Sequence, residues 1–293
     1  MEQVQPSAGT ADRPVDRGGR LRPRGGRDIN RLGFGAMRLT GPGIWGPPAN
    51  RTEALQVLRR SLELGVELID TADSYGPEVS EALIAEALYP YPATLVIATK
   101  GGLTRPAAGD WRRDARPAHL TASCEASLRR LRVDCIELYQ LHAPDPRVPF
   151  EDSIGALVRL KEQGKIRHIG VSNVSVAELR RARALVDVVS VQNRYNVAER
   201  RFDDVLALCE REGIAFLPWS PLSSGPSAGT LRNAALVARR RGATTAQVAI
   251  AWLLARSPVM VPIPGTSSVA HLEENVAAAT LRLHPEDVAE LER

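Results

Sequence analysis

The chain has 293 residues, of which 44% are hydrophobic and 25% charged, with a formal net charge of +4. This composition is typical of a globular protein with a large core, and most of the positive excess lies in residues 13–31, which hold seven arginines. Nucleic-acid recognition would need a basic face with stacking aromatics or a known module, and aromatic residues make up only 4%. We therefore expect no nucleic-acid partner.

Cysteine content and hydropathy indicate the compartment in which the protein works and whether it spans a membrane. The three cysteines, Cys124, Cys135 and Cys209, are odd in number and form no CxxC pair, which is typical of a reducing compartment. The first residues lack the apolar segment of a secretory signal, and no apolar run approaches the roughly 18 residues of a spanning helix. We expect a cytoplasmic protein with no membrane partner, and no pattern indicates an oligomeric state.

The predicted elements begin with a polar amino terminus. Residues 1–19 are rich in proline, glycine and alanine and predict a disordered basic tail. The Gly25-Gly26 pair then predicts a hairpin turn between two short segments. Further on, apolar runs alternate with segments of helical periodicity. The predicted strands are 32–37, 66–70, 94–100, 135–142, 166–173, 188–193, 214–220 and 259–265. The predicted helices are 52–65, 78–88, 118–131, 153–164, 176–185, 202–213, 231–242, 245–257 and 269–279.

Eight predicted strands, each followed by a helix, indicate the architecture of the chain. Strands buried on both faces of a parallel sheet are continuous apolar runs, as these are. Eight such units in about 260 residues fit a TIM barrel better than an open sheet. A Rossmann fold would show GxGxxG after an early strand, and no such match occurs. The sequence therefore predicts an α/β protein with one domain, a (β/α)8 barrel over residues 20–293 that includes the amino-terminal hairpin.

Polar or aromatic residues end most of the predicted strands. Asp70, Lys100 and His142 end the second, third and fourth strands, where TIM barrels carry their active sites. Each residue alone has an ordinary explanation, as a turn former, a solvated charge or a structural histidine. Together they are the arrangement expected of an active site. Later strands end in Ser172-Asn173, Gln192-Asn193 and Trp219-Ser220.

Tyr75 follows Asp70 by five residues and can complete this set. A group that protonates a carbonyl oxygen near neutral pH needs an accessible proton, and the pKa of a free tyrosine is near 10. A neighbouring ammonium such as that of Lys100 is expected to lower the pKa of Tyr75. The carboxylate of Asp70 would hold Lys100 in place and keep it charged, and His142 would orient the substrate oxygen.

Several motifs of this chain resemble those of the aldo-keto reductase superfamily. They are IDTADSYG, VIATKGG, LYQLHAPD, GKIRHIGVSN, VQNRYN, LPWSPL and IPGTSSVAHLEEN, and the resemblance covers roughly residues 29–290. The strings GPGIWGPP and ALYPYP are similar to a bacterial branch that resembles pyridoxal reductases. The resemblance implies an NADP(H)-dependent enzyme that reduces an aldehyde or ketone, with Asp70, Tyr75, Lys100 and His142 as the catalytic residues.

The resemblance also implies where the cofactor binds. Ser172, Asn173 and Gln192 would hold the nicotinamide carboxamide, and Trp219 would stack on the ring unless it is simply a core residue. The remaining implied contacts are Ser220, Pro221 and Leu222 along the diphosphate and Gly265, Thr266, Ser267, His271, Glu274 and Asn275 at the adenosine end.

Two of these positions depart from the family pattern. Many relatives have a lysine and an arginine where this chain has Gly265 and His271, so the 2′-phosphate of NADPH would meet hydroxyls, backbone and a titratable histidine. We expect NADPH as the cofactor, with NADH as a second one. His271 and Glu274 lie one helical turn apart, but no third ligand accompanies them, and we expect no metal.

The substrate would be set by the loops at residues 40–49, 101–116, 143–150 and 222–230. Their composition suits a moderately apolar carbonyl compound, and the resemblance makes pyridoxal a candidate. Trp45 would be either a pocket wall or a loop anchor. Arg105, Arg112 and Arg113 would either attract an anionic substrate or be solvated. An alternative function is an NADP(H)-binding regulatory or scaffold subunit on the same fold.

Overall fold

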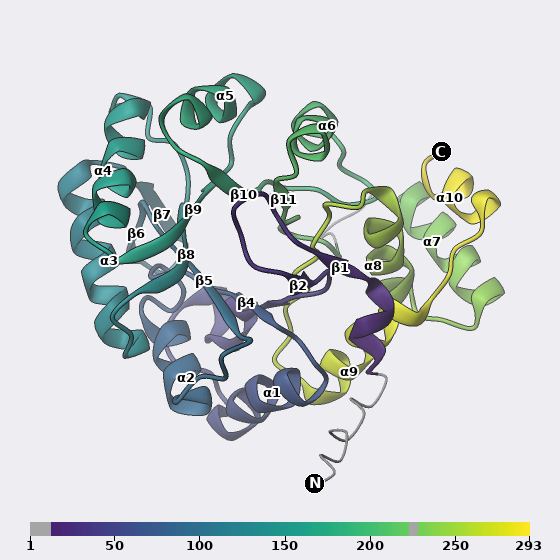
Figure 1. Cartoon of the computed structure of the whole chain (residues 1–293). Helices are drawn as coiled ribbons and strands as arrows, with labels where there is room; N and C mark the ends of the chain where they lie inside the picture. The colour runs from purple at the N-terminus through teal and green to yellow at the C-terminus, as the bar shows by residue number, and fades with distance from the viewer. Residues whose placement is uncertain (1–12, 223–227) are drawn as a thin grey trace, which may run out of the picture.

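The computed structural model describes residues 13–222 and 228–293. A parallel sheet curls around the centre of the molecule and helices surround it (Figure 1). The strands lie in the order β11-β10-β9-β8-β5-β4-β3, which confirms the predicted TIM barrel. Their bounds are β3 (Phe34–Gly35), β4 (Leu68–Asp70), β5 (Val96–Gly101), β8 (Ile136–Leu141), β9 (Ile166–Ser172), β10 (Val188–Gln192) and β11 (Ala215–Phe216).

The predicted eighth strand, residues 259–265, is not a strand in the structure. The segment nevertheless lies between the two edge strands. Phe216 of β11 exchanges backbone hydrogen bonds of 2.8 and 2.9 Å with it, and the N–H of Gly35 in β3 donates to the carbonyl of Pro264 at 3.2 Å. Pro262 and Pro264 have no N–H to donate, so the segment cannot form a regular ladder with either neighbour. An irregular segment therefore closes the barrel.

The helices form a ring outside the sheet, and two of them form a satellite pair (Figure 1). Asn50 caps the first helix through its side chain, which accepts from the N–H of Glu53, and Gly213 ends the sixth in the left-handed region. The ring comprises α1 (Arg51–Glu63), α2 (Val79–Leu88), α3 (Pro117–Leu131), α4 (Phe150–Glu162), α5 (Val176–Leu185), α6 (Asp203–Glu212), α8 (Thr245–Arg256) and α9 (Val269–Ala277). The pair comprises α7 (Ala228–Arg241) and α10 (Pro285–Leu291).

The amino-terminal segment is more ordered than predicted. Residues 1–12 of the predicted disordered tail lie outside the described residues, but Pro14–Gly18 form a 3-10 helix, η1, in which Val15 is fully buried in the main core. The predicted hairpin is present as β1 (Arg20–Leu21) and β2 (Ile29–Asn30). It crosses the centre of the ring in Figure 1, and its apolar residues pack into the barrel interior, which closes the amino-terminal end.

Three further features were not predicted. A hairpin of β6 (Leu103–Ala107) and β7 (Asp110–Arg113) occupies a segment expected to be a loop. The carboxyl-terminal helix α10 was also missed. Short 3-10 helices form at η2 (Ala36–Leu39), η3 (Pro42–Ile44) and η4 (Ala278–Thr280), so the first strand is shorter than its apolar run. None of the helices in the described part of the chain combines the length and the hydropathy that a membrane span needs.

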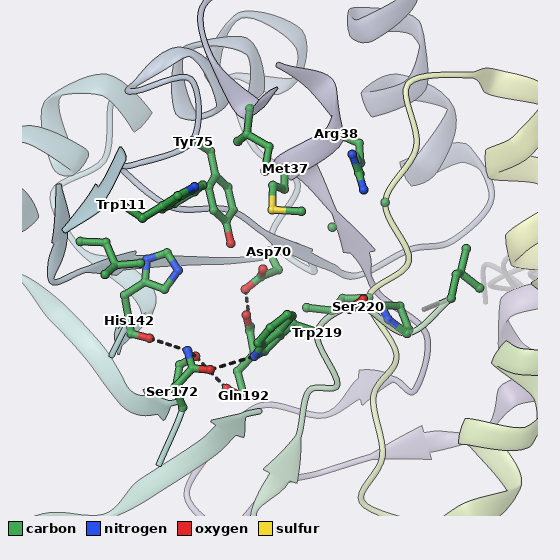
Figure 2. A pocket seen from close by; sticks show the side chains of 18 residues that line it. Met37, Arg38, Asp70, Tyr75, Trp111, His142, Ser172, Gln192, Trp219 and Ser220 are labelled. Carbon is green, nitrogen blue, oxygen red and sulfur yellow. Dashed lines mark hydrogen bonds between the residues drawn. The ribbon is translucent and has the colours of Figure 1, made fainter. Parts of the chain in front are cut away.

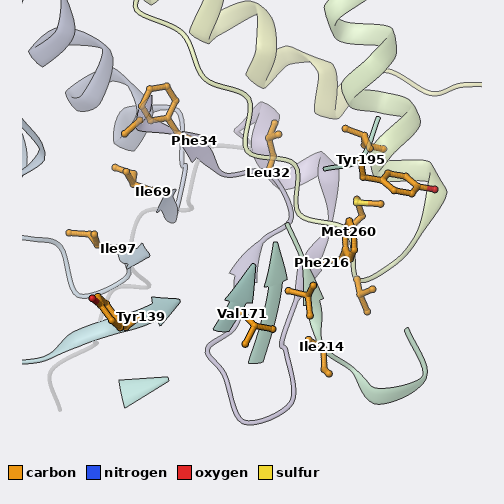
Figure 3. Packing of buried hydrophobic residues seen from close by; sticks show 14 of the residues in the cluster. Leu32, Phe34, Ile69, Ile97, Tyr139, Val171, Tyr195, Ile214, Phe216 and Met260 are labelled. Carbon is orange, nitrogen blue, oxygen red and sulfur yellow. The ribbon is translucent and has the colours of Figure 1, made fainter. Parts of the chain in front are cut away.

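The core has two layers, separated by the sheet. The larger layer lies between the strands and the helices, and Figure 3 shows Ile69, Ile97 and Tyr139 in it. The smaller layer fills the barrel and includes Leu68 and Val96. Because side chains alternate along a strand, residues that follow one another belong to different layers. The same alternation determines which strand-end residues reach the barrel mouth.

Candidate active site

Strand alternation brings the predicted catalytic residues to one place. Leu68 points into the barrel, so Asp70, two residues later, does so as well. The same relation holds between Val96 or Ala98 and Lys100 on β5. His142 stands just beyond the end of β8, and all of these polar side chains are buried. The three groups therefore converge at the carboxyl ends of adjacent parallel strands, as predicted.

Lys100 is the centre of this cluster. Its fully buried ammonium donates to Asp70 Oδ2 at 2.8 Å, to the carbonyl of Thr71 at 2.8 Å and to the hydroxyl of Tyr75 at 3.3 Å. Three partners match the three donors of an ammonium group, so Lys100 is buried with its hydrogen bonds satisfied. The loop that leaves β4 after Asp70 therefore folds back, so that the phenol of Tyr75 lies close to the end of that strand.

Asp70 is held from its other side by two glutamines. Its Oδ1 accepts from Nε2 of Gln192 at 2.8 Å and from Nε2 of Gln140 at 3.3 Å. Gln140 in turn accepts from the hydroxyl of Ser190 at 3.2 Å. The sequence analysis did not select Gln140, although its place two residues before the inward-facing His142 marks it as inward-facing too. Both oxygens of the carboxylate are thus fixed before any ligand binds.

The pKa values in this cluster correct one expectation. Burial raises the pKa of Tyr75 and outweighs the opposing effect of Lys100, so the net shift is upward rather than downward. Burial alone would lower the pKa of Lys100, but Asp70 and Tyr75 together raise it above its usual value. At neutral pH the structure therefore contains a charged lysine beside an uncharged phenol that retains its proton.

His142 is the fourth member of the cluster. Its ring meets that of Tyr75 edge to face at 5.8 Å, and its Nδ1 lies 3.4 Å from the hydroxyl of Ser74. Burial, with a smaller effect of Lys100, lowers the pKa of His142 well below its usual value. The imidazole is therefore neutral at physiological pH and can hydrogen-bond an oxygen without adding charge.

A cavity of about 620 Å³ opens onto these side chains (Figure 2). Tyr75, Asp70 and His142 line it, while Lys100 lies behind them. Of the predicted cofactor-binding residues, those that line it are Ser172, Asn173, Gln192, Trp219, Ser220, Pro221, Leu222 and Gly265. Ile44, Leu103 and Trp111 also line it and lie in the predicted substrate loops 40–49 and 101–116, whereas the sequence analysis did not select Gly35, Met37, Arg38 and Ile263. The predicted substrate loop 222–230 lies largely outside the described residues.

Asn173 organises the side of the cavity opposite Tyr75. Its amide nitrogen donates to the carbonyl of His142 and to Ser172 Oγ, each at 3.0 Å, and its Oδ1 accepts from the indole N–H of Trp219 at 3.0 Å. Asn173 has φ 59°, a left-handed conformation that asparagine tolerates better than most residues. Trp219 is therefore held by a hydrogen bond in the cavity wall and is not a fully buried core residue.

The predicted adenosine-end residues divide into two groups. Gly265, Thr266 and Ser267 line a second cavity of about 530 Å³, which shares Arg38 with the first. The residues on α9 line neither cavity: His271 is exposed, Glu274 accepts a hydrogen bond from Thr244, and Asn275 is 4% exposed. Arg38 follows Met37 in η2, the 3-10 helix that comes after β3, and the sequence analysis did not consider it.

Asp73 is a second buried carboxyl beside the cluster. Its backbone N–H donates to the carbonyl of Lys100 at 3.3 Å, and its Oδ1 is buried without a hydrogen-bond partner among the described residues. Nearby Glu81 is fully buried and accepts from Thr99 and Arg130, each at 2.6 Å. Burial first, and then the negative charge of Glu81, raise the pKa of Asp73 from 3.8 to about 7. Asp73 therefore ionises near neutral pH.

This shift predicts a pH-dependent stability. The folded state binds the proton of Asp73 more tightly than the unfolded state, so this group reduces stability progressively as pH rises from about 4 to about 7. The Asp73→Asn variant cannot ionise, and its melting temperature relative to wild type is expected to be higher at about pH 8 than at about pH 5. Thermal unfolding followed by circular dichroism across this range measures the difference.

A matched control is Asp287→Asn. Hydrogen bonds with the His284 backbone and with two arginines outweigh burial and lower the pKa of Asp287 to about 2. Its effect on the melting temperature is expected to be constant between about pH 5 and about pH 8, where the carboxylate is ionised in both states. A pH-independent effect of Asp73→Asn would contradict the assignment of a raised pKa to Asp73.

Comparison with known proteins identifies the family. A sequence model described as the aldo/keto reductase family matches residues 31–293, and the chain belongs to this family. It is 49% identical over 266 residues to an uncharacterized oxidoreductase of Schizosaccharomyces pombe, covering 90% of this chain and 86% of that protein. It is 44% identical over 276 residues to the pyridoxine 4-dehydrogenase of Escherichia coli, covering 92% and 96%. The resemblance to the aldo-keto reductase superfamily is thereby confirmed, and a bacterial pyridoxine 4-dehydrogenase is among the similar proteins.

Solved structures agree with this assignment. A thermostable aldo-keto reductase crystallised with the inhibitor epalrestat superposes with a TM-score of 0.82 at 32% identity, covering 93% of this chain and 98% of that one. An aldo/keto reductase from Klebsiella pneumoniae in complex with NADP and acetate gives a TM-score of 0.78 at 26% identity, covering 93% of each chain. The protein is therefore an oxidoreductase of this family with the family's barrel.

Proposed function

We propose that this protein is an NADPH-dependent carbonyl reductase in which Tyr75 donates the proton to the carbonyl oxygen. The observation that carries the proposal is a buried contact: the Tyr75 hydroxyl lies 3.3 Å from the ammonium of Lys100, which Asp70 anchors at 2.8 Å. The phenol is uncharged at neutral pH, and burial raises its pKa further above the usual value, so it has a proton to give. It also lines the cavity that a substrate would enter.

The other residues have distinct roles in this proposal. When the carbonyl oxygen takes the proton, negative charge develops on Tyr75, and the ammonium of Lys100 stabilises it. Asp70 keeps that ammonium charged and in place. The neutral imidazole of His142 hydrogen-bonds the carbonyl oxygen and orients it toward the phenol. Orientation of the substrate and electrostatic stabilisation together lower the activation free energy of the reduction.

The proposed cofactor is a reduced nicotinamide nucleotide, which would supply the hydride. Two acceptors are available to the NH2 group of a carboxamide: Gln192 Oε1 has no hydrogen-bond partner among the described residues, and Asn173 Oδ1 accepts only one bond there. We assign Ser172 to the same group and Trp219 to the ring face. Ser220, Pro221 and Leu222 would lie along the diphosphate, and Gly265, Thr266 and Ser267 at the adenosine side.

The preference for NADPH over NADH is supported by one charge in the site. Arg38 lines both cavities, and no ion pair occupies it among the described residues. Arg38 would supply a fixed positive charge for the cofactor phosphates. Gly265 has no such charge, and the exposed His271 has one only when it is protonated. The solved relative crystallised with NADP agrees with this choice. His271, Glu274 and Asn275 stay in the proposal only as the far end of the adenosine site.

Pyridoxal is the first substrate to test. The relative with 44% identity is named for the oxidation of pyridoxine, and reduction of pyridoxal is the reverse of an alcohol oxidation. The cavity wall around Tyr75 includes Met37, Leu103 and Trp111, which suit a flat and largely apolar ring. We therefore propose an aldehyde of this kind as the substrate.

Two measurements on the purified protein test this proposal together. Fluorescence titration with NADPH and NADH gives their dissociation constants, and we expect NADPH to bind more tightly. Consumption of NADPH is then followed with pyridoxal and a panel of other aldehydes and ketones. Turnover with a carbonyl compound is the expected result. Tight NADPH binding without turnover on any member of the panel would instead favour the regulatory or scaffold function.

A further inference from the structure

The β6–β7 hairpin stands at the cavity mouth, and one buried side chain holds it against a neighbouring loop. A two-stranded hairpin is at best marginally stable alone, so side chains must fix it to the barrel. Of residues 103–113, all of which the structure describes, Arg105 is the one that is buried, at 7% exposed. Trp111 on the opposite strand is 38% exposed and lines the cavity. Arg105 therefore decides where this hairpin, and Trp111 with it, is held.

The guanidinium of Arg105 contacts two other segments. Its two terminal nitrogens donate to the carbonyls of Ile44 and Gly43 at 3.1 and 3.2 Å. Its Cζ lies over the ring of Trp111, 3.7 Å from the ring centroid, and 5.5 Å from the ring centroid of Trp45. A guanidinium suits this position because it can stack on a ring and donate in its own plane at the same time.

These contacts continue to the proposed proton donor by two routes. On one route, Trp45 pairs with Gly76 in an isolated bridge, next to Tyr75 in the chain. On the other, the ring of Trp111 meets that of Tyr75 edge to face at 6.5 Å. The wall beside Tyr75 is therefore built from two loops that Arg105 joins.

The backbone of the first loop is under strain. Ile44 has φ 59°, a left-handed conformation that is rare for a β-branched residue. Such a conformation persists only where surrounding contacts hold it, and the hydrogen bond from Arg105 to the Ile44 carbonyl is one of them. Ile44 also lines the cavity, so loss of this contact would change the shape of the substrate space.

We propose that Arg105 is a positioning residue that fixes Trp111 and Ile44 as a rigid wall beside Tyr75, and that this wall selects flat, uncharged aromatic aldehydes. The inference rests on the proposed carbonyl reductase function and goes beyond it by naming the substrate class and the residue that sets it. Trp111 offers an aromatic surface next to the proton donor, and its stack with Arg105 prevents it from swinging away.

The charge distribution explains why the substrate is uncharged. Arg105 does not line the cavity, and its terminal donors are already engaged. Arg112 pairs with Asp110 at 2.7 Å outside the cavity lining. Among the described lining residues the cation is Arg38, which adjoins Gly265 on the proposed cofactor side. The hypothesis that Arg105, Arg112 and Arg113 attract an anion is therefore not supported.

The test compares three aldehydes on the full-length protein with NADPH. Benzaldehyde is flat and neutral, cyclohexanecarbaldehyde has a ring of similar size that is not flat, and 2-carboxybenzaldehyde is flat but anionic. For wild type we expect kcat/KM to be highest for benzaldehyde. In Arg105→Met we expect the preference for benzaldehyde over cyclohexanecarbaldehyde to fall about tenfold, mainly through a higher KM with kcat little changed. An unchanged preference would overturn the proposal.

A double-mutant cycle asks whether Arg105 acts through Trp111. If it does, Arg105→Met combined with Trp111→Leu lowers the preference no further than Trp111→Leu alone. Additive losses would contradict the positioning role. Arg112→Met, on the same hairpin, is the control and should keep the wild-type preference. Arg105→Lys, which keeps the charge but not the planar stack, replaces Arg105→Met in the cycle if that variant does not fold.

The outcomes separate this inference from the proposed function. If wild type reduces no aldehyde or ketone, the proposed function fails, and if it reduces ketones but none of the three aldehydes, only the inference about substrate class fails. If wild type is active and the Arg105 variants bind NADPH normally but keep the wild-type preference, the function stands and the positioning role of Arg105 is rejected.

Discussion

Replacing Tyr75 with phenylalanine is expected to lower the kcat of carbonyl reduction by about 10²- to 10⁴-fold, the usual contribution of general acid catalysis. The substitution removes one oxygen atom and the proton that it carries, and leaves the ring that packs against Trp111 and His142. The ion pair of Lys100 with Asp70 is also kept. NADPH binding and the melting temperature are therefore expected to change little. Steady-state kinetics measures kcat, fluorescence titration measures NADPH binding, and thermal unfolding gives the melting temperature.

Tyr139→Phe provides the matched control for this variant. Tyr139 pairs with Thr99, next to Lys100, but its side chain points to the helix side of the sheet. Tyr139 is buried, as Tyr75 is, and its hydroxyl lies 3.5 Å from the carbonyl of Leu120. Loss of this hydroxyl should leave kcat near the wild-type value. Equal losses of kcat in the two variants would mean that the Tyr75 hydroxyl contributes to packing and does not donate the proton.

Replacing Lys100 with methionine is expected to affect both stability and activity. Methionine fills a similar volume but leaves the carboxylate of Asp70 buried without its cation. Removing one partner of a buried ion pair costs about 3–5 kcal/mol of folding free energy. Activity should fall as well, because the charge that stabilises ionised Tyr75 is gone. Urea denaturation and steady-state kinetics measure the two effects.

The double variant Lys100→Met with Asp70→Asn separates the effect of Lys100 on stability from its effect on activity. With both charges removed, no unpaired ion stays in the core, and much of the lost stability should return. Asparagine can keep an acceptor for the amides of Gln140 and Gln192, which now bond to the carboxylate. Activity should stay low, since Lys100 is still absent. Recovery of activity together with stability would show that Lys100 serves the fold and not the reaction.

The placement of the proposed catalytic residues could be predicted from the sequence because it depends on strand position. Asp70, Lys100 and His142 each follow an apolar run, and parallel strands bring such positions to one end of a barrel. Burial was harder to anticipate. The effect of Lys100 on Tyr75 follows from residue type, but the larger, opposite effect of burial depends on how completely the phenol is enclosed.

The errors have local physical reasons. The segment 259–265 has the apolar composition of a strand, but its two prolines cannot donate to a ladder. The β6–β7 hairpin is short and mostly polar, and it depends on a tertiary anchor rather than on its own pattern. That anchor, Arg105, belongs to a residue type that is rarely buried, and its stack on Trp111 needs the folded loops.

The contacts among the buried charged residues around Asp73 could not be predicted from the sequence either. Glu81 lies 8 residues from Asp73 in the chain, but Arg130 comes from α3, which follows α2 only after the three strands β5, β6 and β7. No spacing rule predicts that these groups meet, because the helices that carry them are brought together by apolar faces. Their contacts required the structure.

The most direct measurement is a single-turnover experiment on wild type and Tyr75→Phe. Each protein is loaded with NADPH in a stopped-flow instrument and mixed with excess benzaldehyde or pyridoxal, and the alcohol formed is quantified. If Tyr75 is the proton donor, wild type forms one alcohol per NADPH consumed, and the variant binds NADPH equally well but reacts about 10²-fold or more slowly. Equal single-turnover rates in the two proteins would contradict the assignment of Tyr75 as the proton donor.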